Sequence, residues 1–222
     1  MSETHKREDE NLRSLCRRFG VVLSREQTYR LDIFLDELEE WNRKLNLTGL
    51  SSRQRIINEL LIDSLMPSPF LHDEGSLLDV GSGAGFPAIP IKICKPRLRF
   101  HLVEPNSKKV SFLKHVIRLT RLQDIEVIKG HIEKGENLLD SVGYNAITSR
   151  GLAPLPQYLT VCAPHLTPGG LIVAFLGRDR ESVLRESEEV MRKHRIFPFK
   201  SIPYSLPGKT SRRELLILKK RD

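Results

Sequence analysis

The sequence lacks the features that would place the chain in a membrane or around a metal. None of its apolar runs approaches the roughly 20 residues needed to cross a bilayer. Residues 1–10 are polar and of mixed charge, without the apolar stretch of a secretory signal. The three cysteines are far apart, and no Cys/His spacing is typical of a metal site. We therefore expect free thiols, no bound metal, no membrane contact and a cytoplasmic location.

Acidic residues are scarce in one window of a chain whose net charge is +8. Glu104 is the only acid between residues 92 and 121, where nine basic residues occur: Lys92, Lys95, Arg97, Arg99, Lys108, Lys109, Lys114, Arg118 and Arg121. A second basic stretch runs from residue 178 to residue 221. Such an excess suits a polyanionic partner, because phosphates bind Lys and Arg and release counterions. Solvated surfaces would have the same composition, so charge alone leaves both interpretations open.

Helical spacing dominates residues 11–74. Ser24 and Gln27 have the spacing of a capping box. The apolar residues that follow recur every three or four positions and predict one long amphipathic helix: Leu31, Phe34, Leu35, Leu38, Trp41 and Leu45. A second helix is predicted over 54–65, before Pro67. We expect residues 1–10 to form a disordered tail and residues 11–74 a helical region that packs on the rest of the protein.

Short β-branched runs alternate with helical stretches in residues 75–222. This alternation predicts a Rossmann-like α/β domain with a mostly parallel, seven-stranded sheet and helices on both faces. The strands are expected at 77–80, 100–103, 125–128, 144–148, 171–175, 199–202 and 215–218. The helices are expected at 87–94, 108–119, 155–165 and 181–194, with a turn at Pro168-Gly169-Gly170.

A glycine loop follows the first predicted strand, where Gly81, Gly83 and Gly85 are spaced GxGxG. Glycines let the backbone approach a ligand, and ligands of such sheets bind beyond the carboxyl ends of the strands. The spacing differs from the GxGxxG of dinucleotide-binding enzymes, and a pyrophosphate would gain nothing from the nearby acids. Asp79 instead suits the ammonium and sulfonium of S-adenosylmethionine, and Glu104 can accept hydrogen bonds from its ribose hydroxyls.

The loop therefore predicts a class I S-adenosylmethionine-dependent methyltransferase. Its expected cofactor contacts are Asp79, Gly81, Ser82, Gly83, Gly85 and Glu104. A nicotinamide enzyme and a purely structural turn are the alternatives.

The segment after the fourth predicted strand bears on the methyl acceptor. Enzymes that methylate exocyclic amines carry an Asp/Asn-Pro-Pro-aromatic box there, whereas this chain has Thr148-Ser149-Arg150-Gly151. No cysteine lies in a loop suited to attack C5 of cytosine. N7 of guanine needs neither device, because it is an exposed lone-pair acceptor that carries no proton. Positioning of the sulfonium and N7 can then supply the catalysis.

Four stretches together resemble the bacterial ribosomal RNA small subunit methyltransferase G family, also called GidB. They are LLDVGSGAGFPAIPI at 77–91, LVEPNSKKVSFL at 102–113, ITSRGLAPL at 147–155 and WNRKLNLT at 41–48. The resemblance implies methyl transfer from S-adenosylmethionine to N7 of a guanine in 16S RNA, with S-adenosylhomocysteine as the second product. It also implies that the partner is 16S RNA or the 30S subunit, and we expect a monomer.

The resemblance also implies roles for individual residues. Gly81, Phe86, Glu104, Ile132 and Glu133 would bind the cofactor. Arg150 would lie near cofactor and target, and Asn46 near the active-site entrance, so these two are the candidate catalytic residues. A surface arginine and a helix-ending asparagine are the structural alternatives.

The chain departs from the family pattern on the expected RNA side. Glu59-Leu60 replaces Arg-His, His131 replaces an arginine, and Leu176 replaces a lysine. These losses motivate a second hypothesis, an RNA- or ribosome-binding protein that keeps the cofactor without efficient transfer. A small-molecule methyltransferase is the third hypothesis, and the basic window argues against it.

Overall fold

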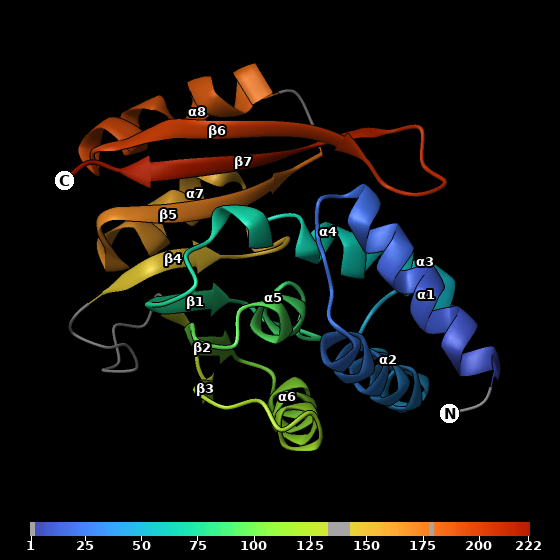
Figure 1. The fold of residues 1–222 in the computed structure, drawn as a ribbon. Helices are drawn as coiled ribbons and strands as arrows, with labels where there is room; N and C mark the ends of the chain where they lie inside the picture. The colour runs from blue at the N-terminus through green and yellow to red at the C-terminus, as the bar shows by residue number, and fades with distance from the viewer. Residues whose placement is uncertain (1–2, 133–142, 178–179) are drawn as a thin grey trace.

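A computed structural model of the protein describes residues 3–132, 143–177 and 180–222. Its centre is a seven-stranded sheet in the order β3-β2-β1-β4-β5-β7-β6 (Figure 1). The strands from β3 to β5 are parallel, and β7 pairs antiparallel with both β5 and β6. The mostly parallel, seven-stranded α/β sheet that the sequence predicts is therefore confirmed.

The N-terminal region consists of helices that lie against one side of the sheet. They are α1 (Glu3–Arg18), α2 (Arg25–Leu45), α3 (Arg53–Ile56), η1 (Ile57–Leu61), α4 (Ile62–Leu65) and η2 (Ser68–Phe70). Ser24 and Gln27 form the predicted capping box, and Asn46 ends α2 in the left-handed conformation. The second predicted helix forms, with a π-helical turn, η1, between α3 and α4.

The parallel half of the sheet alternates strand and helix. Its elements are β1 (Ser76–Val80), α5 (Ala88–Cys94), β2 (Arg99–Glu104), α6 (Ser107–Leu119), β3 (Ile125–Lys129), β4 (Tyr144–Thr148), α7 (Leu155–Cys162), η4 (Ala163–His165) and β5 (Leu166–Leu176). The chain then continues through α8 (Arg180–Lys193), β6 (Ile196–Ser205) and β7 (Arg212–Lys220).

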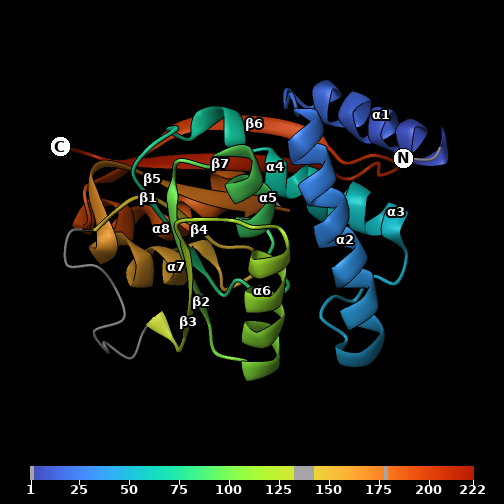
Figure 2. The same ribbon diagram turned by 60° about the horizontal axis from the view of Figure 1, so that its bottom comes forward.

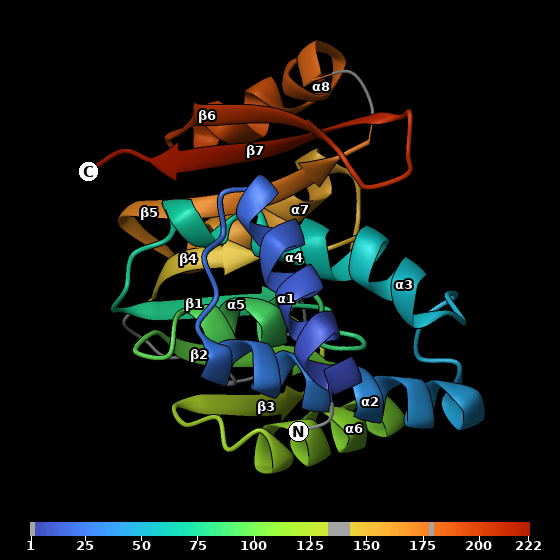
Figure 3. The same ribbon diagram turned by 45° about the vertical axis from the view of Figure 1, so that its right-hand side comes forward.

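The two faces of the sheet bury separate hydrophobic clusters. One cluster joins α1, α2, α5 and α6 to the sheet through residues such as Phe34, Phe100 and Phe112. The other lies under α7 and α8 and includes Ile147, Leu159 and Val183. Figure 2 shows α2 and α6 next to each other, and Figure 3 shows α1 running upward from α2, in front of the sheet. Among the described residues, no helix has the length and apolar character needed to span a membrane.

Two expectations about local structure differ from what the structure shows. Residues 1–10 do not form a disordered tail throughout, since α1 begins at Glu3. The Pro168-Gly169-Gly170 segment lies within β5 rather than before it, and the β4–β5 register shifts between Tyr144 and Ala146. Proline and glycine inside a strand mark such irregularities as well as turns, so the same residues fit both outcomes.

Candidate functional site

The glycine loop begins where β1 ends and is fastened to the neighbouring strand. The backbone N–H groups of Gly81 and Ser82 donate to the carbonyl of Val103, at 2.9 and 3.2 Å. Gly81, Gly83 and Gly85 all have positive φ, at 72°, 55° and 87°. Side chains rarely adopt this conformation, so the loop path requires these glycines.

Glu104, at the end of β2, is buried behind this loop. Its Oε2 accepts the Gly83 N–H at 2.8 Å, and its Oε1 accepts the Asn106 N–H at 2.8 Å. Sequence reasoning assigned this carboxylate to ribose hydroxyls. In the structure it also positions the loop, and each oxygen keeps a second lone pair for a ligand.

Asp79 is fully buried beneath the loop, opposite Thr148 in the register of β1 and β4. Its Oδ1 accepts the Thr148 hydroxyl at 2.7 Å, while its Oδ2 has no hydrogen-bond partner among the described residues. Burial raises the pKa of Asp79 from its ordinary value of 3.8 to about 6, and the charge of Glu104 adds to the rise. A buried carboxylate oxygen without a donor is costly, so a ligand donor here would be stabilising.

An open pocket of about 510 Å³ lies over the glycine loop. The loop forms one wall with Gly81, Ser82, Gly83, Ala84 and Phe86, and the segment Leu47–Leu50 after α2 forms another. The lining also includes three cations from separate elements: Lys109 of α6, Arg150 after β4 and Arg213 of β7. These elements meet at the carboxyl ends of the parallel strands, where open α/β sheets bind ligands.

Arg150 and Arg213 are held by one buried carboxylate, Asp63 of α4. Asp63 Oδ2 accepts Arg150 Nε and an Arg213 guanidinium nitrogen, both at 3.0 Å, and its Oδ1 accepts the Tyr204 hydroxyl. Arg150 also donates to the backbone carbonyl of Glu59 at 3.3 Å. Two guanidinium groups share one carboxylate, so the cluster carries a net positive charge toward the pocket. Burial and Asp63 raise the pKa of Tyr204, which keeps its hydroxyl a donor.

Glu59, which the resemblance implies stands in place of an arginine, contributes to this pocket as an ion-paired side chain. Its carboxylate contacts Arg55 Nε at 2.9 Å and Lys209 Nζ at 3.3 Å, and these bonds lower its pKa. The trio has a net charge of +1, so Arg55 and Lys209 together outweigh the charge of Glu59. Of the other departures, Leu60 lines the pocket, Leu176 is buried and His131 is exposed.

The remaining predicted site residues differ in their relation to the pocket. Phe86 lines it, and its ring packs 5.1 Å from that of Phe34. Asn46 is exposed and is not a lining residue; its left-handed backbone directs Leu47–Leu50 into the wall. Ile132 packs against the cluster beneath α7 and α8. Glu133 lies outside the described residues.

The basic window splits into two parts. Lys92 is buried and donates to the carbonyls of Pro96 and Leu98, and burial lowers its pKa. Lys95 and Arg97 pair with Asp73. The hypothesis that the basic window binds phosphates therefore does not hold for Lys92, because its ammonium faces the protein interior. The cations of α6 remain on the surface, apart from the half-buried Lys109.

Sequence reasoning missed Arg213 and Tyr204. They lie 150 and 141 positions from Asp63, and only the pairing of β6 with β7 brings them to the site. Their local sequence carries no motif that could have identified them.

Comparison with known proteins agrees with this architecture. The family model "rRNA small subunit methyltransferase G" (GidB) matches residues 27–212. A ribosomal RNA small subunit methyltransferase G from Syntrophotalea carbinolica is 34% identical over 210 residues, covering 95% of this chain and 97% of that protein. The protein of the same name from Chloroflexus aggregans is 35% identical over 203 residues, covering 90% and 85%.

Solved structures support the fold. A methyltransferase from Pyrococcus furiosus has a TM-score of 0.56 at 19% identity and covers 88% of this chain and 100% of its own. M. jannaschii TYW2 in complex with AdoMet has a TM-score of 0.56 at 13% identity, covering 72% and 75%. The chain thus has the Rossmann-like fold of class I methyltransferases, as the glycine loop predicts.

Proposed function

Because the chain belongs to the ribosomal RNA small subunit methyltransferase G family, we propose that it transfers the methyl group of S-adenosylmethionine to N7 of a guanine in 16S ribosomal RNA. The observation that carries this proposal is the pocket in which the glycine loop faces Lys109, Arg150 and Arg213. One wall suits a cationic methyl donor and the other an anionic acceptor strand.

The residues around the loop fit S-adenosylmethionine. Gly83 leaves open space where a side chain would stand, since the nearest atom to an added Cβ is the Gly81 carbonyl oxygen at 3.7 Å. Asp79 offers a buried carboxylate to the cationic part of the cofactor, and Glu104 offers free lone pairs to its ribose. Ser82, Gly85 and Phe86 would shape the loop and pocket wall around it. The cofactor supplies a methyl group on a sulfonium, and the chain supplies the position.

The acceptor side fits a base whose ring nitrogen needs no deprotonation. The described pocket lining includes one carboxylate, Glu59, which Arg55 and Lys209 already engage, so it is not free to act as a base. Arg150 is fixed by Asp63 and would orient the target nucleotide through charge-assisted bonds. Asn46 would act indirectly by shaping the segment Leu47–Leu50, and Ile132 and Glu133 remain proposed cofactor contacts.

An RNA-binding protein without efficient transfer is the second candidate, because Glu59 places a negative charge at the pocket. Its ion pairs favour the enzyme, since they return the local charge to positive. We propose a cytoplasmic monomer that acts on 16S RNA or on the 30S subunit.

A methylation assay decides between these functions. The protein is incubated with labelled S-adenosylmethionine and naked 16S RNA, 30S subunits from a strain that lacks the enzyme, or neither. Label at a site of chemical cleavage specific for 7-methylguanine is the expected result, and it also identifies the substrate form. Cofactor binding without transfer to either RNA form would contradict the proposal and favour the binding protein.

A further inference from the structure

The outer face of α6 carries a row of cations that the pocket does not use. Ser107, Ser111, Lys114 and Arg118 follow one another at intervals of three or four residues, so they share one face of α6, and Arg121 lies just beyond the end of the helix. Lys114, Arg118 and Arg121 are exposed, and no ion pair among the described residues includes them. We call these three residues the α6 cation row.

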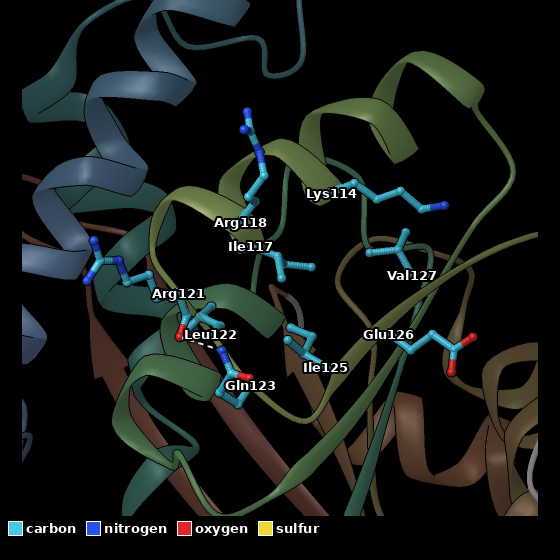
Figure 4. Close-up of a pocket in the computed structure, with 9 residues that line it drawn as sticks. All are labelled: Lys114, Ile117, Arg118, Arg121, Leu122, Gln123, Ile125, Glu126 and Val127. Atoms are coloured by element: carbon cyan, nitrogen blue, oxygen red, sulfur yellow. Dashed lines mark hydrogen bonds between the residues drawn. The ribbon is translucent and has the colours of Figure 1, made fainter.

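The row borders a groove at the edge of the sheet. The groove has a volume of about 580 Å³ and lies between α6 and the edge strand β3. Figure 4 shows Ile117 and Leu122 in its floor, with the side chains of Lys114 and Arg121 extending to opposite sides. Glu126 is the only acid among the residues that line it.

One helix connects this groove to the proposed active site. Lys109, in the first turn of α6, lines the pocket over the glycine loop, whereas Lys114, Arg118 and Arg121 line the groove. A helix of 13 residues is about 20 Å long. A strand of nucleic acid has one phosphate per roughly 3.4 Å along the duplex axis, so the helix could follow about six nucleotides.

We propose that the α6 cation row binds the phosphate backbone of the RNA that flanks the methylated guanine. This inference rests on the proposed function and adds a contact surface to it. Three cations that form no ion pair with any described residue are complementary to phosphates, and they line a groove beside the same helix whose first turn lines the pocket. The row contributes to RNA affinity and leaves the methyl-transfer step to the pocket.

Salt-dependent binding tests the proposal. The triple variant K114Q/R118Q/R121Q is compared with the wild type by fluorescence anisotropy on labelled 16S RNA over a range of salt concentrations. The negative slope of the logarithm of the RNA association constant against the logarithm of the salt concentration should become shallower by about 2 to 3. Each lost phosphate contact removes close to one unit of this slope. In the methylation assay KM should rise about tenfold or more while kcat at saturating RNA and the affinity for S-adenosylmethionine stay unchanged.

A matched control removes the same charge elsewhere. Arg185, Arg192 and Lys193 are exposed on α8, where acids are interspersed, so R185Q/R192Q/K193Q should leave the salt slope near that of the wild type. Glu126→Gln should raise the affinity for RNA, opposite to the effect of K114Q/R118Q/R121Q, because it removes the one acid that lines the groove. Equal effects of the two triple variants, or an unchanged slope in K114Q/R118Q/R121Q, would overturn the proposal.

Two further outcomes separate this inference from its premise. If the wild type binds 16S RNA through the row but transfers no methyl group, the proposed function fails and the surface stands. If transfer proceeds while the row variant keeps normal KM and slope, the surface fails and the proposed function stands. The RNA assignment would also be overturned if K114Q/R118Q/R121Q lost binding to phosphatidylglycerol vesicles, relative to the wild type, but kept its binding to RNA.

Discussion

Gly83 offers the most selective single change in the glycine loop. An added Cβ would meet no protein atom closer than 3.7 Å, but the residue has φ of 55°, which is strained for a β-branched side chain. Gly83→Val should therefore abolish S-adenosylmethionine binding in calorimetry and cost only about 1–2 kcal/mol of unfolding free energy. Unchanged cofactor affinity in a folded variant would refute the placement of the cofactor.

Gly85 is the comparison for this change. A Cβ there would stand 2.7 Å from Ile89 Cγ1 in the first turn of α5. Gly85→Ala should reduce stability more than Gly83→Ala does, because it disturbs core packing as well as the backbone. Comparing substitutions at Gly83 and Gly85 therefore separates a loss of cofactor affinity from a loss of folding stability.

Asp79 makes the stability of the cofactor-free protein depend on pH. Its pKa is about 6 in the folded protein and 3.8 ordinarily, so the unfolded state loses the proton first as pH rises. The folded state is therefore penalised progressively between about pH 4 and pH 6, by up to about 3 kcal/mol at 1.4 kcal/mol per unit. Between pH 4 and pH 7, the unfolding free energy of the wild type should therefore fall by up to about 3 kcal/mol relative to that of Asp79→Asn.

Urea unfolding of both proteins between pH 4 and pH 7 measures that difference. A stability difference that stays constant across this range would show that Asp79 does not titrate there. Saturating S-adenosylmethionine should shrink the difference, because a cationic ligand favours the carboxylate form.

At the scale of elements, Asp63 joins four parts of the chain around the pocket. It holds Arg150 after β4, Arg213 of β7 and Tyr204 of β6 from its place in α4. Asp63→Asn removes the shared charge while keeping the shape. It should lower the unfolding free energy by about 3 kcal/mol, the usual cost of breaking a buried ion pair, and lower kcat about tenfold by releasing Arg150.

Tyr204→Phe is the control for Asp63, since it removes one hydrogen bond and leaves both arginines paired. It should cost about 1.5 kcal/mol and leave kcat near that of the wild type. Urea unfolding and single-turnover methylation measure the two quantities. Equal kcat in Asp63→Asn and the wild type would show that Arg150 needs no fixed position.

The sequence predicts most elements because their patterns are local. The stripe from Leu31 to Leu45, the capping box at Ser24 and the strand before the glycine loop each lie within one element and appear as expected. No local pattern predicts the π-helical turn Ile57–Leu61, and the Pro-Gly-Gly segment in β5 fits a turn as well as an irregular strand. Arg213 was not predicted because its partner Asp63 lies 150 positions away in the sequence. Lys92 is buried rather than exposed, because its ammonium donates to two backbone carbonyls.

At the scale of the whole molecule, residues 11–74 and residues 75–222 share one hydrophobic core. One hydrophobic cluster includes Leu12, Phe34 and Leu61 together with Phe86, Phe100 and Ile217. The Phe34 ring lies 5.1 Å from that of Phe86 and 6.4 Å from that of Phe112. The glycine loop is therefore supported from behind by the N-terminal helices, so we expect a fragment of residues 75–222 to fold incompletely.

Phe34→Ala tests this shared core. Deleting a fully buried phenylalanine should cost about 3–5 kcal/mol, and loss of its contact with Phe86 should weaken S-adenosylmethionine binding although Phe34 is not a pocket-lining residue. Phe199→Ala is the control, because that ring is 55% exposed and its loss should cost less than about 1 kcal/mol. Thermal unfolding and calorimetry measure both effects, and a fragment of residues 75–222 that unfolds cooperatively and binds the cofactor normally would contradict the shared core.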